Sequence, residues 1–148
     1  MSSLDSDHYY YFSSASHSTL SNFYLTDLTY KGTVYNCSEQ AYQHQKALFH
    51  HQHKLAKDIL SSTDPRKQLL YGKYIKTDIS WKSKKVPIMY SILEIKFSTC
   101  PEFRAELAAT RSKVLVENTL NPEWGVGRNR KGCNKLGVVL MELRHRLL

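Results

Sequence analysis

Apolar residues recur three and four positions apart along most of this chain, the spacing at which a helix buries one face. The pattern predicts helices from about residue 38, over 53–61, over 66–74, within roughly 80–98, from Pro101, and along the C-terminal stretch. Asp64 and Pro65 support the third of these, because an acidic N-cap followed by proline in the first turn is a common helix start. The chain is therefore expected to be rich in helix from its second quarter onward.

Specific apolar positions predict the helix within 80–98, the helix from Pro101 and the last helix. Ile88, Ile92, Ile95 and Phe97 mark the expected buried face of the helix within 80–98, which ends before Pro101. From Pro101 the helical count runs through Phe103, Leu107 and Thr110 and continues to Val114 and Leu115. The last helix carries one apolar stripe made of Leu136, Val139, Leu140, Leu143 and Leu147.

The first 35 residues follow a different pattern. Residues 9–35 are rich in Tyr, Phe, Thr and Ser, a composition typical of short strands and loops. The segment Tyr30–Tyr35, "YKGTVY", predicts a tight hairpin. Residues 1–8 are polar and are expected to be flexible. Since no repeat or Pro/Gly-rich linker divides the rest, residues 9–148 are expected to form a single compact domain of the α+β class, dominated by helices, with a few short N-terminal strands.

Composition narrows the protein class. With 148 residues, 41% of them hydrophobic and 23% charged, the chain resembles an ordinary globular protein. No apolar run approaches the roughly 20 residues that a membrane span needs, and the N-terminus lacks the features of a signal peptide. Cys37, Cys100 and Cys133 are odd in number and lack metal-ligand spacing. We therefore expect reduced thiols and a cytoplasmic or nuclear location.

Charge suggests an anionic partner. The formal net charge is +8, which suits phosphate groups on a small molecule or nucleic acid, although a merely basic solvated surface explains it equally well. Four histidines crowd one region: His44, His50, His51 and His53. They lack the i, i+4 pairing with a glutamate that a helical zinc site shows, and no cysteine pair supports them. We expect no metal and no cofactor.

The stretch "YNCSEQAYQHQKA" combines a helix start with three polar groups of chemical interest. Asn36 and Glu39 fit a capping box, and Ser38 is the alternative cap. On the helix that follows, Glu39 and Lys46 are seven residues apart and project from one face. Tyr42 and Gln43 lie between them. A carboxylate, an amide and an ammonium can surround a sugar, but the stretch by itself favours a capping glutamate and a surface lysine.

A second stretch, "WGVGRNRKGCNKLG" over 124–137, places glycines and basic residues before the last apolar stripe. Such a loop lets backbone N–H groups approach a phosphate, and a helix N-terminus adds a positive dipole. Asn134 is well placed as an N-cap or as a ligand-facing amide. The stretch matches neither the P-loop nor the dinucleotide-binding pattern, and a basic turn with a capping asparagine explains it equally well.

Five segments, in this order, resemble the NADAR family, also called YbiA-like. They are "LSNFY" (20–24), "YNCSEQAYQHQKA" (35–47), the spacing Trp81…Met89…Lys96-Phe97, "VLVENT" (114–119) and "WGVGRNRKGCNKLGVVLMELR" (124–144). Together they cover the chain from about residue 10 to its C-terminus. The resemblance implies a compact, helix-dominated α+β domain with N-glycosidase activity.

Family members split N-glycosidic bonds in two settings. One is ribosylaminopyrimidine phosphates, which are intermediates of riboflavin synthesis. The other is ADP-ribose attached to guanine, in nucleic acid such as DNA or in guanosine. Both bonds join ribose C1′ to an exocyclic amine of a guanine-like ring, so one site could serve both substrates. The alternative function is an inactive module that binds ADP-ribose or nucleic acid.

The resemblance also assigns roles to residues. The motif glutamate falls on Glu39 and the motif lysine on Lys46, which are the expected catalytic residues. The expected substrate-binding residues are Asn22, Phe23, Tyr42, Gln43, Trp124, Gly125, Gly127, Arg128, Arg130, Lys131 and Asn134. Val126 stands where some members have an acidic residue, which moves the acid–base work onto Glu39.

The chemistry of the bond allows two mechanisms, which give Lys46 different roles. Cleavage of a glycosylamine builds positive charge at C1′, which a carboxylate such as Glu39 stabilises while it activates water. A glycosylamine can also open its ring to an iminium, which an unprotonated Lys46 would attack to form a Schiff base. Lys46 is thus expected to be either that nucleophile or a contact to ribose or phosphate.

Overall fold

The computed structural model describes residues 7–148, so most of the segment expected to be flexible, residues 1–6, lies outside the described part. The chain divides into two compact units, one made of Asn22–Lys96 and the other of the residues up to Ser21 together with Phe97–Leu148. In the described part helices outnumber strands, and the strands are short. The expected helix-dominated α+β class is confirmed, while the single domain over 9–148 stays a prediction.

The Asn22–Lys96 unit begins with the expected hairpin. Strands β2 (Leu28–Tyr30) and β3 (Thr33–Tyr35) pair antiparallel, with Leu28 opposite Tyr35 and Tyr30 opposite Thr33. The turn between them places Lys31 at φ 50° and Gly32 at φ 82°. Two positive φ values in a two-residue turn match the right-handed twist of the strands, and glycine adopts such a φ without strain.

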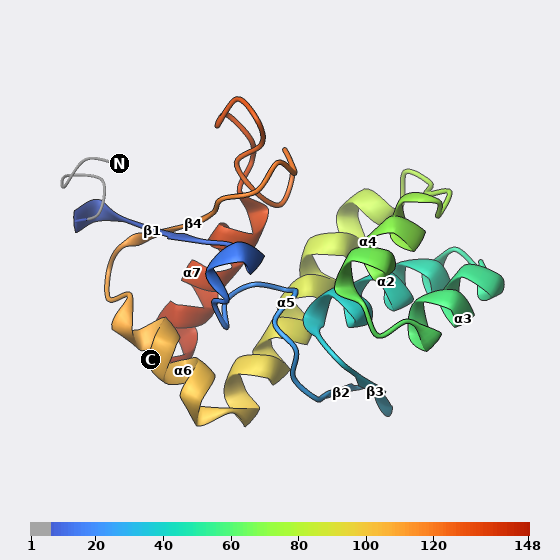
Figure 1. Cartoon of the computed structure of the whole chain (residues 1–148), viewed down its shortest axis with the longest axis horizontal. Helices are drawn as coiled ribbons and strands as arrows, with labels where there is room; N and C mark the ends of the chain where they lie inside the picture. The colour runs from blue at the N-terminus through green and yellow to red at the C-terminus, as the bar shows by residue number, and fades with distance from the viewer. Residues whose placement is uncertain (1–6) are drawn as a thin grey trace. The chain divides into compact units, whose positions relative to one another are not determined.

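Helices α2 (Ser38–Phe49), α3 (His53–Ser61) and α4 (Pro65–Lys73) pack against one another in the same unit (Figure 1). Their shared core consists of Ala47, Ala56, Ile59 and Ile75, with Leu55 and Tyr71 packed against it. The carboxylate of Asp64 accepts a hydrogen bond from the backbone N–H of Arg66 at 2.9 Å, with Pro65 in the first turn. The expected positions of α3 and α4 are therefore confirmed.

The start of α2 differs from the expected capping box. Cys37 is the N-cap, and its Sγ accepts a hydrogen bond from the N–H of Gln40 at 3.4 Å. The Asn36 side chain instead donates to the carbonyl of Thr63 at 2.8 Å, and the Asn36 N–H donates to Gln40 Oε1 at 2.7 Å. The capping box of Asn36 with Glu39 is wrong, because Gln40 takes the place that the pattern gave to Glu39.

Helix α5 (Trp81–Thr99) lies where the pattern placed a helix, but its buried face is shifted. Ile88 and Ile95 are only half buried. The buried positions are Trp81, Met89, Ile92, Leu93, Lys96 and Phe97. The pattern placed Ile92 and Phe97 on this face correctly, but it left out Lys96, because a lysine is not expected at a buried position. In the described part of the chain, no helix combines the length and apolar character of a membrane span.

The second unit contains β1 (Tyr9–Phe12), the short 3-10 helix η1 (Ser14–Ser16), α6 (Pro101–Ala109), β4 (Val114–Glu117) and α7 (Lys135–Leu147). Strand β1 pairs parallel with β4, Tyr9 opposite Val114, and α7 packs against β4 (Figure 1). The expected continuation of the Pro101 helix to Leu115 is wrong. Arg111, at φ 54°, breaks the helical path, and Val114 and Leu115 belong to a strand.

Candidate active site

The first two turns of α2 bury polar side chains where most helices bury apolar ones. These residues are Ser38, Glu39, Gln40, Gln43 and His44. Glu39 is 7% exposed, so its carboxyl group is almost entirely removed from water. Buried polar groups cost free energy unless they are paired, and for this reason they concentrate at networks and functional sites.

Asn22 fixes the position of Glu39. The backbone N–H of Glu39 donates to the carbonyl oxygen of Asn22 at 3.0 Å. The hydroxyl of Ser38 donates to Asn22 Oδ1 at 2.8 Å, and Asn22 Nδ2 donates to Met89 Sδ at 3.7 Å. Asn22 thus anchors the N-terminus of α2 beside the carboxyl group, and its role as a substrate contact stays a prediction.

The environment of Glu39 favours a neutral carboxyl group. Burial raises the pKa of Glu39 from its ordinary value to about 7. The side-chain hydrogen bond from Gln43 and the charge of Lys46 act against burial, since both favour the ionised form. A carboxyl group with a pKa near neutrality can donate a proton in one step and accept one in the next. The group can therefore act as both acid and base.

Lys46 lies two turns further along α2 and is only half buried. Its Nζ donates to the carbonyl oxygen of Gly72, in the last turn of α4, at 3.1 Å. Gln43 lies between Glu39 and Lys46 on α2 and contacts the same glycine. The structure thus brings Glu39, Gln43 and Lys46 together on one face of α2, and the last two of them contact Gly72 of α4.

The remaining candidates in this unit are aromatic. Tyr42 is buried, and its ring centroid lies 5.9 Å from that of Trp81. Phe49 and His50 also pack on Trp81, at centroid distances of 5.2 and 5.5 Å. Trp81 is therefore a core residue. Phe23 is half buried. Substrate contacts by Tyr42 and Phe23 stay predictions.

The second candidate stretch belongs to the other unit and forms a loop closed by its own backbone. The N–H of Gly125 donates to the Asn121 carbonyl at 3.1 Å, and that of Gly127 donates to the Thr119 carbonyl at 3.0 Å. At the start of α7, the N–H of Leu136 donates to the Trp124 carbonyl at 3.1 Å. These three amides therefore donate to carbonyls of the loop itself, and substrate contacts by Gly125 and Gly127 stay predictions.

Asn134 has a different role from the one the sequence suggests. It adopts a left-handed φ of 52° at the N-cap position, but its side chain makes no capping bond to α7. Instead its Oδ1 accepts from the N–H of Glu117 at 3.0 Å, and its Nδ2 donates to the carbonyl of Leu115 at 2.8 Å. Asn134 therefore fastens the start of α7 to β4, and the side-chain cap is wrong.

The basic side chains of this loop lie on the surface. Arg128, Arg130 and Lys131 are all exposed, and Trp124 is half buried. Arg130 donates to Asn118 Oδ1 at 3.2 Å and lies 5.3 Å from the centre of the Tyr11 ring. A phosphate contact of the loop would fall to these exposed side chains, and it stays a prediction.

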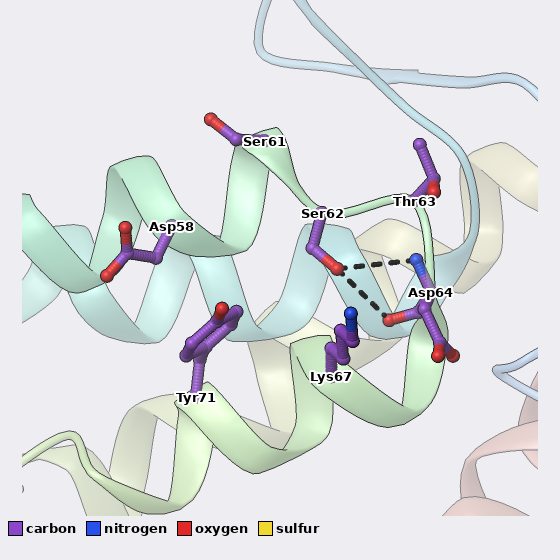
Figure 2. A pocket seen from close by; sticks show the side chains of 7 residues that line it. All are labelled: Asp58, Ser61, Ser62, Thr63, Asp64, Lys67 and Tyr71. Atoms are coloured by element: carbon purple, nitrogen blue, oxygen red, sulfur yellow. Dashed lines mark hydrogen bonds between the residues drawn. The ribbon is translucent and has the colours of Figure 1, made fainter.

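An open surface pocket lies where α3 meets α4 (Figure 2). Its lining residues are Asp58, Ser61, Ser62, Thr63, Asp64, Lys67 and Tyr71. The hydroxyl of Ser62 is hydrogen-bonded to the backbone N–H and carbonyl of Asp64, at 3.3 and 3.4 Å (Figure 2). These polar groups form the turn into α4. None of the residues expected to act in catalysis or binding lines this pocket.

The histidines near α2 make contacts of their own. His44 Nδ1 lies 2.6 Å from the hydroxyl oxygen of the buried Tyr35, and burial lowers the pKa of His44. His50 Nδ1 lies 2.7 Å from the carbonyl oxygen of Lys46. Across residues 7–148, no three His, Cys, Asp or Glu side chains are grouped as metal ligands would be.

Gly72 is the site neighbour that the sequence did not single out. It stands inside a helical pattern, "QLLYGKY", where glycine is less favourable than alanine by about 1 kcal/mol. An isolated glycine in such a place signals a close approach by another group. The glycine within this helical pattern could therefore have identified Gly72 from the sequence.

Comparison with known proteins agrees with the motifs. The family model described as the NADAR domain matches residues 4–148. N-glycosidase YbiA of Shigella boydii is 35% identical over 141 residues, which cover 93% of this chain and 86% of that protein. The chloroplastic riboflavin biosynthesis protein PYRR of Zea mays is 39% identical over 79 residues, 53% of this chain and 12% of that protein. The NMR structure of the E. coli protein YbiA is 33% identical, with a TM-score of 0.79 over 95% of this chain and 86% of that one.

Proposed function

The chain belongs to the NADAR domain family and is an N-glycosidase, and on this premise we propose that it hydrolyses the bond between ribose C1′ and an exocyclic amine of a guanine-like base. The proposed substrates are ADP-ribose attached to guanine, in nucleic acid or a nucleoside, and ribosylaminopyrimidine phosphates of riboflavin synthesis. The name of the maize relative supports the second substrate. A net charge of +8 suits the phosphates that both substrates carry.

The buried carboxyl group of Glu39 carries this proposal. Breaking the C1′–N bond leaves an electron pair on the amine, which departs more easily once it is protonated. Glu39, with a pKa raised to about 7, holds a proton that it can donate to this nitrogen. The resulting carboxylate takes a proton from a water molecule while the oxygen of that water attacks C1′. One water is consumed, and Glu39 regains its proton.

Two roles are proposed for Lys46. As an ammonium held by the Gly72 carbonyl, it would bind ribose or phosphate and stabilise ionised Glu39. As an unprotonated amine, it would attack C1′ of the ring-opened iminium, expel the base amine and leave a Schiff base that water hydrolyses. Lys46→Arg separates these roles, because arginine retains the charge but is not a nucleophile. Borohydride would trap the Schiff base as a mass increase on Lys46.

The decisive assay compares wild type with Glu39→Gln on both substrates, with released base and sugar measured by mass spectrometry. We expect release by wild type and a loss of about 100-fold or more in kcat for Glu39→Gln, the usual contribution of a general acid–base. Glu102→Gln, at an exposed glutamate on α6, is the matched control and should retain the wild-type rate. Full activity of Glu39→Gln would overturn the assignment.

The second candidate function, an inactive module that binds ADP-ribose or nucleic acid, is favoured by the basic charge of the chain. The same assay separates it from the enzyme. No release from either substrate, with equal ADP-ribose binding by wild type and Glu39→Gln, would support the binding module.

A further inference from the structure

Gly72 contacts the candidate site through its carbonyl group. It lies in the last turn of α4 and is buried. The carbonyl oxygen of Gly72 accepts from the backbone N–H of Ile75 at 3.3 Å, and carbonyls in the last turn of a helix carry the negative end of the helix dipole. Nζ of Lys46 donates to the Gly72 oxygen at 3.1 Å. The end of α4 thus holds the ammonium group in place.

The missing side chain of Gly72 matters as much as its carbonyl. A Cβ placed on this residue would overlap Oε1 and Cδ of Gln43 and would lie 2.9 Å from Nε2. The whole amide of Gln43 therefore occupies the space that a side chain at position 72 would fill. Any larger residue at this position has to displace the Gln43 amide.

The Gln43 amide is hydrogen-bonded to Glu39 on one side and fills the space beside Gly72 on the other. Gln43 makes the side-chain hydrogen bond to Glu39 that favours the ionised carboxylate. Its Oε1 is buried and has no hydrogen-bond partner among the described residues. Since the oxygen forms no bond that would orient it, the shape of the space at Gly72 is what allows the amide to reach Glu39.

We propose that Gly72 is a positioning residue for Glu39 and Lys46, because its carbonyl holds the lysine and its lack of a side chain admits the glutamine that orients the carboxyl group. The inference rests on the proposed function only for its catalytic consequence. The geometric part concerns the contacts of Gly72 with Lys46 and Gln43, and its effect on the Glu39 carboxyl group can be measured without substrate.

The test is a double-mutant cycle of wild type, Gly72→Ala, Gln43→Ala and Gln43→Ala/Gly72→Ala. The primary measurement is the pKa of Glu39, followed by NMR of its carboxyl carbon. Gly72→Ala should raise the pKa of Glu39 above its wild-type value, because displacement of Gln43 removes a hydrogen bond to the charged form. Gln43→Ala should raise it equally. Adding Gly72→Ala to Gln43→Ala should change it no further.

The rate measurements follow the same logic. Gly72→Ala should lower kcat about tenfold or more and move the pH–rate profile to higher pH, since Glu39 would ionise later. Gly32→Ala, at a hairpin glycine where an added Cβ would meet nothing within 4 Å, is the control for loss of a glycine in the same unit. It should leave the pKa of Glu39 and the pH–rate profile unchanged.

Several outcomes would overturn the proposal. A wild-type pKa and rate in Gly72→Ala would show that position 72 does not control Gln43. Additive effects in the double variant would show that Gly72 acts by another route. If Gly72→Ala alone failed to fold, recovery of folding in the double variant would support the clash with Gln43, and failure of both would overturn it. A wild type without turnover would refute the proposed function, and the pKa cycle would still decide the role of Gly72.

Discussion

Glu39 owes its chemistry to the removal of water. Its carboxyl group lies close enough to Gln43 and Lys46 for both to favour ionisation, and yet burial outweighs them and raises its pKa to about 7. A carboxylate loses far more hydration free energy on burial than a neutral acid does, so burial favours the protonated form. The residue is consequently a liability for folding at high pH, in keeping with a group retained for function.

This liability predicts a pH-dependent stability. The pKa of Glu39 lies near 4.5 in the unfolded chain and at about 7 in the fold, so the folded state binds the extra proton between these values. Its contribution is complete below pH 4.5 and is lost as the pH rises through 7. Glu39→Gln, which stays neutral, should be more stable than wild type above pH 7, by up to about 3 kcal/mol. Urea unfolding at pH 4.5 and 8 measures the difference.

The control for this prediction is again Glu102→Gln, whose glutamate is exposed. It should shift the free energy of unfolding by less than about 0.5 kcal/mol at either pH. A Glu39→Gln variant with the same stability difference from wild type at both pH values would contradict the raised pKa.

Helix α2 is joined to its neighbours by Gln40, which lies one residue beyond the carboxyl group. Its Nε2 lies 3.1 Å from the Ile59 carbonyl oxygen and 3.0 Å from that of Ser62, at the end of α3. Its Oε1 accepts from the N–H of Asn36 at 2.7 Å. One buried amide thus satisfies backbone groups at the C-terminus of α3 and before α2.

Loss of this amide should weaken the packing of α2 against α3. Gln40→Leu should lower the free energy of unfolding by about 3 kcal/mol, because it leaves several buried backbone groups without partners. Gln45→Leu on the same helix, where Nε2 makes a single bond to the Tyr35 hydroxyl at 3.0 Å, should cost about 1 kcal/mol. Chemical denaturation measures both. Equal losses in the two variants would show that the Gln40 network contributes nothing special.

The charge of the whole molecule should affect how a phosphorylated substrate binds. The chain has 21 lysine and arginine residues against 13 acidic ones. Attraction between such a surface and a phosphate is weakened by salt, because the Debye length falls from about 10 Å at 0.1 M to about 3 Å at 1 M. Binding of a phosphorylated substrate should therefore be more sensitive to salt than binding of its unphosphorylated form.

We expect KM for a ribosylaminopyrimidine phosphate to rise several-fold when NaCl is raised to about 0.5 M, while KM for the unphosphorylated nucleoside changes little. The double variant Arg128→Ala/Lys131→Ala, which removes two exposed charges of the 124–137 loop, should reduce the salt effect. An equal salt dependence for both substrates would show that the net charge acts elsewhere.

Several elements were determined by the sequence alone. The hairpin predicted at 30–35, helices α3 and α4, and the final helix all lie where local patterns placed them. Each depends on contacts between near neighbours, such as a cap by Asp64, a first-turn Pro65 or a turn glycine at 32. The motifs also identified the family, and they placed Glu39 and Lys46 on one face of a helix. Local rules suffice for such features because their causes lie within a few residues.

Tertiary structure decided the rest. Val114–Glu117 forms a strand because it pairs with Tyr9–Phe12. This partner lies about 100 residues away in the sequence, so a count of local apolar positions could not distinguish the strand from a continuing helix. The side chain of Asn134 hydrogen-bonds the backbone of β4 and makes no capping bond to α7. Cys37, and not Asn36, caps α2. Both differences depend on contacts with residues that are distant in the sequence. The acid character of Glu39 and the role inferred for Gly72 come from burial and from contact between α2 and α4. Exclusion of water and close packing are properties of the folded chain, and they decide which of the polar residues visible in the sequence can do chemistry.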